Sequence, residues 1–124
     1  MSLEFETQAT FKTGVKMYDE LNIYDENMNL KQSEVDDLDT IIKHFGVKHQ
    51  IVEKTVEELK ELIDEIQAGS PETIFEETCD VILMIFQLQR IYGWTDKEIQ
   101  EQIASKKERT LERIKSGYYE NRNN

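Results

Sequence analysis

The chain has 124 residues and carries 26 acidic side chains against 15 basic ones, for a formal net charge of −11. This length suffices for one domain with a modest core and leaves no room for two. So acidic a surface repels a phosphate backbone, which argues against DNA or RNA as a partner, whereas a small phosphorylated ligand that arrives with metal ions stays compatible with the charge.

The sequence predicts a cytoplasmic protein that makes no contact with a membrane. Its N-terminus has neither the basic nor the apolar segment of a signal peptide. The longest apolar run, Val81–Phe86, is far below the roughly 20 residues that span a bilayer. The single cysteine, Cys79, excludes an intrachain disulfide, fits a reducing compartment and is expected to be a buried thiol.

Three parts are predicted along the chain: an N-terminal extension over residues 1–35, a helical domain over 36–117 and a C-terminal tail over 118–124. Within the extension, apolar and polar residues alternate weakly over residues 3–11, a pattern compatible with a short strand. The rest of the extension follows no single period.

Four helices are predicted for the helical domain, over residues 36–45, 48–67, 71–92 and 96–115. Glycines separate them, and two of the helix starts carry clear signals. Ser70 is an N-cap residue followed by proline at the first helical position. Thr95 and Glu98 form a capping box for the last helix. The expected fold is therefore all-α and resembles a four-helix bundle.

Apolar residues in the second and third helices indicate how the bundle packs. The second helix has one apolar stripe at helical spacing, which we expect to form its core contact. The stripe consists of Val52, Val56, Leu59, Ile63 and Ile66. In the third helix, Val81–Phe86 is apolar on every side, and one chain covers such a segment poorly. We therefore expect a second copy of the chain to complete the bundle as a symmetric dimer.

Two pairs of carboxylates are the candidate metal site. Glu58 and Glu61 stand three residues apart in the second helix, and Glu77 and Asp80 do so in the third. This spacing places both members of a pair on one helix face, roughly 5–6 Å apart at Cβ, where like charges repel unless a cation lies between them. Two such pairs on adjacent antiparallel helices provide four oxygen ligands, the donor set of Mg²⁺ or Mn²⁺.

The motif pair resembles that of a known family. Glu57-Glu58-x-x-Glu61 followed by Glu77-x-x-Asp80 is similar to the E-E-x-x-E and E-x-x-D signature of the MazG-like, all-α nucleoside triphosphate pyrophosphohydrolases. The resemblance covers about residues 40–115, and the segments Phe45-Gly46, His49-Gln50 and Gly93-Trp94 add weak support at its flanks.

The resemblance implies the following fold, reaction and residues. Helical protomers pair into dimers, as a homodimer or a dimer of dimers, and a nucleotide substrate is cleaved between its α and β phosphates to a nucleoside monophosphate and pyrophosphate. The cofactor is Mg²⁺, with Mn²⁺ possible. The implied metal ligands are Glu58, Glu61, Glu77 and Asp80. The implied catalytic residues are Glu57, which would orient the attacking water or a ligand, and Glu61.

Substrate contacts are expected from four basic residues. Lys106, Arg109 and Arg113 share one face of the last helix and resemble the phosphate-contacting residues of the family. Many members carry asparagine four residues after the lysine, where this chain has Thr110. Lys54 shares a polar ridge with Glu58, where it either meets a phosphate or offsets the repulsion between the acids.

Two other functions fit the pattern less well. One is pyrophosphate release from a phosphoribosyl-nucleotide on the same scaffold, and the other is a non-enzymatic acidic helical adaptor. A ferritin-like di-iron site needs Glu-x-x-His, whereas Ile41 and Gly46 stand three residues before His44 and His49. The base of the substrate is not indicated, although several aromatic residues, Phe45 among them, are candidates to stack on it.

Overall fold

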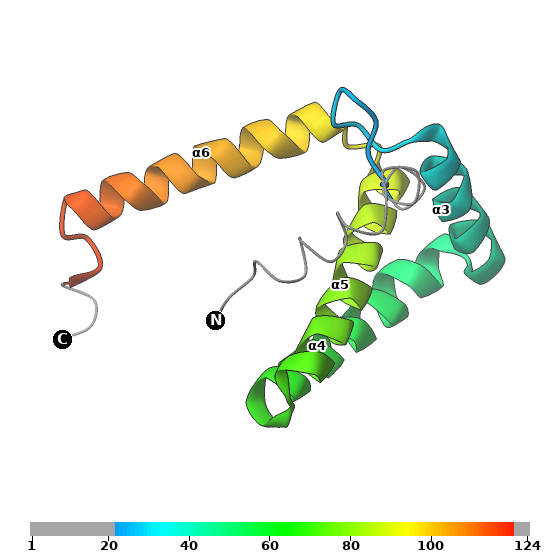
Figure 1. The fold of residues 1–124 in the computed structure, drawn as a ribbon, viewed down its shortest axis with the longest axis horizontal. Helices are drawn as coiled ribbons and strands as arrows, with labels where there is room; N and C mark the ends of the chain where they lie inside the picture. The colour runs from blue at the N-terminus through cyan, green and yellow to red at the C-terminus, as the bar shows by residue number, and fades with distance from the viewer. Residues whose placement is uncertain (1–21, 121–124) are drawn as a thin grey trace, which may run out of the picture. The chain divides into compact units, whose positions relative to one another are not determined.

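A computed structural model describes residues 22–120 of the chain (Figure 1). The chain divides into two compact units, residues 1–36 and 37–124. In the described part of the first unit, an isolated antiparallel bridge joins Tyr24 to Leu30. Asp25 Oδ1 stabilises the turn between them by accepting hydrogen bonds from the backbone N–H groups of Asn27 and Asn29. The strand predicted over residues 3–11 lies outside the described residues.

Helices account for most of the described chain, so the prediction of an all-α fold is confirmed. They are α3 (Gln32–Phe45), the π-helix η1 (His49–Lys54), α4 (Thr55–Ala68), α5 (Pro71–Tyr92) and α6 (Asp96–Lys115). Between residues 22 and 120 there is no β-strand beyond the single bridge. None of the helices in this range combines the length and apolarity that crossing a membrane requires.

The predicted helix starts are present. Ser70 accepts a hydrogen bond from the Thr73 backbone N–H, with Pro71 at the first position of α5. The capping box of Thr95 and Glu98 opens α6. α5 ends at Gly93, whose φ of 73° lies in the left-handed region that glycine adopts without steric cost.

The central contact of the second unit is the antiparallel pair of α4 and α5, which lie side by side in Figure 1. Their packing core is small and partly polar. Val81 and Met84 of α5 are buried, and so are the amides of Gln50 and Gln87 and the carboxylate of Glu58. Two residues of α3, Leu38 and Ile42, are also buried. An Asp39–Arg90 ion pair, with Nε 2.6 Å from Oδ1, connects α3 to α5.

The prediction that the apolar stripe forms the core contact of α4 is wrong for the single chain. The five stripe residues are between 43 and 60% exposed, because the polar ridge containing Glu58, and not the stripe, faces α5. Cys79 is likewise exposed, since it lies about 140° around α5 from the buried Met84. The structure thus buries Gln50, Glu58 and Gln87 together with Val81 and Met84 where its two central helices pack, and leaves the apolar stripe of α4 exposed.

Candidate metal centre

The two carboxylate pairs come together because the connection between α4 and α5 is very short. Gly69 and Ser70 alone separate the helices, which forces them to run antiparallel. Glu61 and Glu77 then lie about two turns from this connection, and Glu58 and Asp80 about three turns. Carboxylates from two separate parts of the sequence are therefore at matching heights on adjacent helices.

Three of the four predicted ligands form a compact cluster. Glu58, Glu77 and Asp80 each offer a carboxylate oxygen, and these oxygens all lie within 4.8 Å of one another. Glu58 is buried, with 7% of its surface exposed, Glu77 is half-buried and Asp80 is exposed. The cluster thus extends from the helix interface to the surface.

Two carboxylate oxygens of these residues are free to bind a cation. Glu58 Oε2 and Glu77 Oε2 are buried and have no hydrogen-bond partner. A buried carboxylate oxygen without a partner is costly, because it has lost its water and gained nothing in return. A hard divalent cation such as Mg²⁺ or Mn²⁺ prefers this set of carboxylate oxygens. The cluster therefore fits the metal that the sequence predicts.

Glu61, the fourth predicted ligand, borders this cluster and interacts with it electrostatically. The negative charge of Glu58 raises the pKa of Glu61 to about 7, with further contributions from desolvation and from the charge and hydrogen bond of Glu77. Without a cation, Glu61 is therefore partly protonated near neutral pH, because the neighbouring negative charges disfavour its ionised form and keep its pKa raised.

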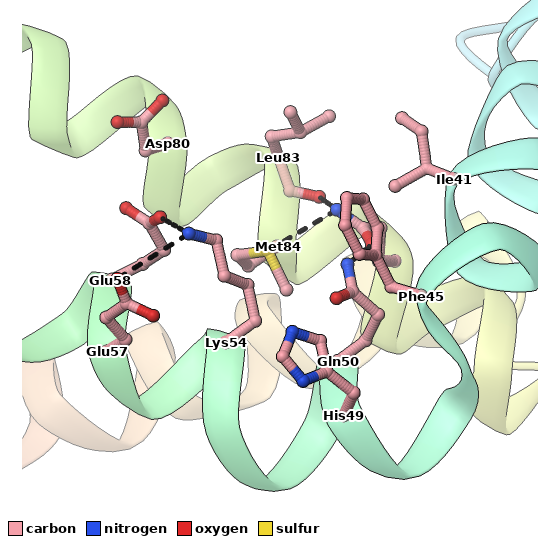
Figure 2. A pocket seen from close by; sticks show the side chains of 11 residues that line it. Ile41, Phe45, His49, Gln50, Lys54, Glu57, Glu58, Asp80, Leu83 and Met84 are labelled. Carbon is pink, nitrogen blue, oxygen red and sulfur yellow. Dashed lines mark hydrogen bonds and ion pairs between the residues drawn. The ribbon is translucent and has the colours of Figure 1, made fainter.

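Lys54 already supplies one positive charge to the site. Its Nζ lies 3.0 Å from Glu58 Oε1 and 3.7 Å from Glu57 Oε1 (Figure 2). The hydrogen bond to Glu58 is the main cause of its raised pKa, so the lysine remains charged. Two roles are predicted for Lys54. Its contacts with Glu57 and Glu58 fit the role in which its positive charge offsets the repulsion between the acids. A phosphate contact remains a prediction.

A cavity of about 330 Å³ adjoins the cluster. Figure 2 shows carboxylates at one end and aromatic and amide side chains at the other. The cavity is lined by Ile41, Phe45, His49, Gln50, Lys54, Glu57, Glu58, Asp80, Leu83, Met84 and Gln87. Its volume is in the range of small-ligand sites, roughly 300–1,000 Å³.

The predicted basic residues of α6 do not join this cavity. Lys106 and Arg109 are exposed and Arg113 is half-exposed, with its guanidinium 4.7 Å from the centre of the Tyr118 ring. Lys106 lines a different hollow, beside Trp94. No residue of α6 is buried. The role of these three residues in binding substrate therefore remains a prediction.

The sequence predicts no role for Gln50 or Gln87. Each is almost fully buried, and Gln50 Nε2 donates a hydrogen bond of 2.7 Å to Gln87 Oε1. Their spacing contains a usable signal. Gln50 lies about two turns before Glu58 and Gln87 about two turns after Asp80. On antiparallel helices these two displacements run in the same direction, so the amides meet next to the carboxylates.

The π-helix η1 improves this alignment. On a regular α-helix, Gln50 and Glu58 would point about 80° apart. A π-turn holds more residues and rotates each of them less, which reduces that angle. The bond that defines the turn runs from the Thr55 backbone N–H to the Gln50 carbonyl, which also accepts from Thr55 Oγ1 at 2.6 Å. The π-helix thus brings Gln50 towards the same face as Glu58.

The raised pKa of Glu61 predicts how metal-free stability depends on pH. Between about pH 4.5 and pH 7 the folded protein keeps a proton on Glu61 that the unfolded chain has released. The free energy of unfolding should therefore fall as pH rises through this window. Glu61→Gln should remove this part of the decline, as measured by urea unfolding in EDTA.

The comparison with Glu65→Gln isolates the effect. Glu65 is half-buried one turn further along α4 and lies outside the carboxylate cluster, so this variant should keep the wild-type pH dependence. An equal dependence in wild type and Glu61→Gln would show that Glu61 does not hold the proton.

Comparison with known families gives a match to the central and C-terminal part of the chain. The model of the MazG nucleotide pyrophosphohydrolase domain matches residues 47–114, a range that includes η1, α4, α5 and most of α6. It therefore contains the complete carboxylate cluster together with Gln50 and Gln87. Neither a curated protein nor a solved structure gives a significant match to the chain.

Proposed function

The chain belongs to the MazG nucleotide pyrophosphohydrolase family, and on this premise we propose that it hydrolyses a nucleoside triphosphate between the α and β phosphates. The products are a nucleoside monophosphate and pyrophosphate. One feature carries the proposal: Glu58, Glu77 and Asp80 each bring a carboxylate oxygen within 4.8 Å of the others, and Glu58 and Glu77 each keep a buried oxygen without a partner, beside a cavity large enough for a nucleotide's base.

Glu58, Glu61, Glu77 and Asp80 hold the metal in this proposal. Bound Mg²⁺ supplies positive charge to the phosphate oxygens and acts as a Lewis acid towards water. The protein contributes the fixed carboxylates on two rigid helices, which would hold the cation in place beside the cavity. No nucleophilic side chain takes part.

Two further residues act on the water and the phosphates. Glu57 is exposed at the edge of the cavity, a position from which its carboxylate orients the attacking water. Lys54 Nζ lies between Glu57 and Glu58. From this position Lys54 would contribute a further positive charge next to the substrate's phosphates.

The functional unit in this proposal is a homodimer or a dimer of dimers. The exposed stripe on α4 supports this, together with Ile82 and Ile85 of α5, which are 44% and 49% exposed. Large apolar side chains that are exposed along a helix face mark interaction sites. The basic residues of α6 also remain without a role in a single chain, and a second copy gives them a phosphate to bind.

Product analysis is the direct test. Purified protein should release pyrophosphate from at least one nucleoside triphosphate in the presence of Mg²⁺ and none in EDTA. ³¹P NMR distinguishes pyrophosphate from orthophosphate, so it identifies which anhydride bond breaks. A nucleoside diphosphate with orthophosphate as the products would contradict the proposed cleavage site. A phosphoribosyl-nucleotide included in the same panel tests the sister reaction.

A further inference from the structure

The buried amides of Gln50 and Gln87 form a second polar feature of the cavity, distinct from the carboxylates. Gln50 is 3% exposed and Gln87 is 2% exposed. Both residues line the cavity. In Figure 2 the Gln50 amide points towards the other side chains that line it. Gln50 Oε1 is buried and has no hydrogen-bond partner. A buried amide oxygen in this state costs free energy that a ligand donor recovers.

The orientation of both amides follows from one fixed acceptor. Gln87 Nε2 lies 3.4 Å from the carbonyl oxygen of Leu83, which only accepts hydrogen bonds. Gln87 therefore directs its Oε1 towards Gln50. Since this oxygen can only accept, Gln50 Nε2 is the donor of the hydrogen bond between the two amides. The group left over is Gln50 Oε1, an acceptor. A ligand that completes this network has to bring an N–H or O–H donor.

The surrounding side chains suit a flat, partly apolar group. Ile41, Phe45, Leu83 and Met84 line the cavity around the amides, whereas Glu58 and Asp80 line the end next to the carboxylate cluster. An aromatic ring beside a nucleobase favours stacking. The two ends of a nucleotide differ in the same way as the two ends of the cavity. Its phosphates need cations, and its planar base carries N–H groups.

We propose that Gln50 is the base-reading residue of this site, where its Oε1 accepts a hydrogen bond from an N–H group on the Watson–Crick edge of the substrate's base. Gln87 is a positioning residue, since it fixes which atom of Gln50 faces the ligand. This assignment rests on the proposed function for the identity of the ligand as a nucleotide. A site built around a hydrogen bond rejects analogues that lack the donor, because its own buried acceptor is then left unpaired.

The test couples a change in the protein to a change in the ligand. Nucleoside monophosphates are titrated by calorimetry in Mg²⁺ to find the one that binds most tightly. That compound is then compared with its analogue in which the N–H hydrogens of the Watson–Crick edge are replaced by methyl groups. Methylation should weaken binding to the wild type by about tenfold or more. The same methylation should change binding to Gln50→Leu by less than about twofold.

Two controls separate base reading from general effects. Gln89→Leu removes another buried amide of α5, one that bonds to Asp96 and does not line the cavity, and should show the wild-type response to methylation. Ribose 5-phosphate, which has no base, should bind equally well to wild type and Gln50→Leu. If Gln50→Leu fails to fold, the double variant Gln50→Leu/Gln87→Leu takes its place, because removing both partners leaves neither amide unpaired.

The outcomes of this test and of the product analysis are independent. Discrimination that persists in Gln50→Leu overturns the assignment, and so does an equal loss of ribose 5-phosphate binding or wild-type protein that binds no nucleoside monophosphate. A protein that shows the predicted coupling but releases no pyrophosphate supports Gln50 as the base-reading residue and contradicts the proposed reaction. Pyrophosphate release without the predicted coupling supports the proposed reaction and contradicts the assignment of Gln50 as the base-reading residue.

Discussion

Asp80→Asn should lower kcat for pyrophosphate release by about 10²-fold or more, because charge stabilisation by a metal is worth several kcal/mol in the transition state. The substitution keeps the size of the side chain but removes the charge of one member of the three-carboxylate cluster. Since the lost interaction is strongest in the transition state, the effect should appear in kcat more than in KM. Steady-state kinetics at saturating Mg²⁺ measures both.

A matched substitution controls for the loss of an acid. Asp64→Asn removes an exposed carboxylate of α4 that does not belong to the cluster, and should leave kcat within about twofold of the wild type. Full activity in Asp80→Asn would falsify the assignment of Asp80 as a metal ligand. An equal loss in both variants would indicate an effect of net charge and not of the metal centre.

The sequence predicted the helices of the second unit well where capping residues mark their ends. α5 and α6 span the predicted residues 71–92 and 96–115, because Ser70, Thr95 and Gly93 give local signals that do not depend on tertiary packing. The first predicted helix, over 36–45, is longer in the structure, where α3 starts at Gln32. Its start carries no comparable signal.

The carboxylate cluster was predictable for a similar reason. Two pairs at a spacing of three residues, joined by a short connection, can meet only if the helices run antiparallel. The structure brings Glu58, Glu77 and Asp80 together and raises the pKa of Glu61 through the charge of Glu58. The π-helix could not be predicted from the spacing of apolar residues. That spacing is compared with a helix of 3.6 residues per turn, which assumes the same number of residues in every turn.

The orientation of α4 was the main error, and it has a physical cause. An apolar stripe predicts a buried face but does not indicate whether the same chain or another one covers it. Here the polar ridge faces α5, with Gln50 and Glu58 buried, and the stripe is left exposed. A single chain that places charge inside and apolar residues outside is incomplete by the ordinary rule of burial.

This arrangement predicts that the chain associates through α4 and α5 and that Ile85→Glu abolishes the association. In the single chain Ile85 is 49% exposed, so a glutamate there is tolerated by an isolated protomer. Against a second copy the same carboxylate would be buried without a partner, at a cost of several kcal/mol on each side of a symmetric interface. Sedimentation equilibrium should give at least twice the chain mass of 14.7 kDa for the wild type and the single mass for Ile85→Glu.

Gln100→Glu on α6 adds the same charge at an exposed polar position and should leave the wild-type mass unchanged. A wild type that stays monomeric at micromolar concentration would refute the association, and an Ile85→Glu variant that keeps the wild-type mass would place the interface elsewhere on the chain.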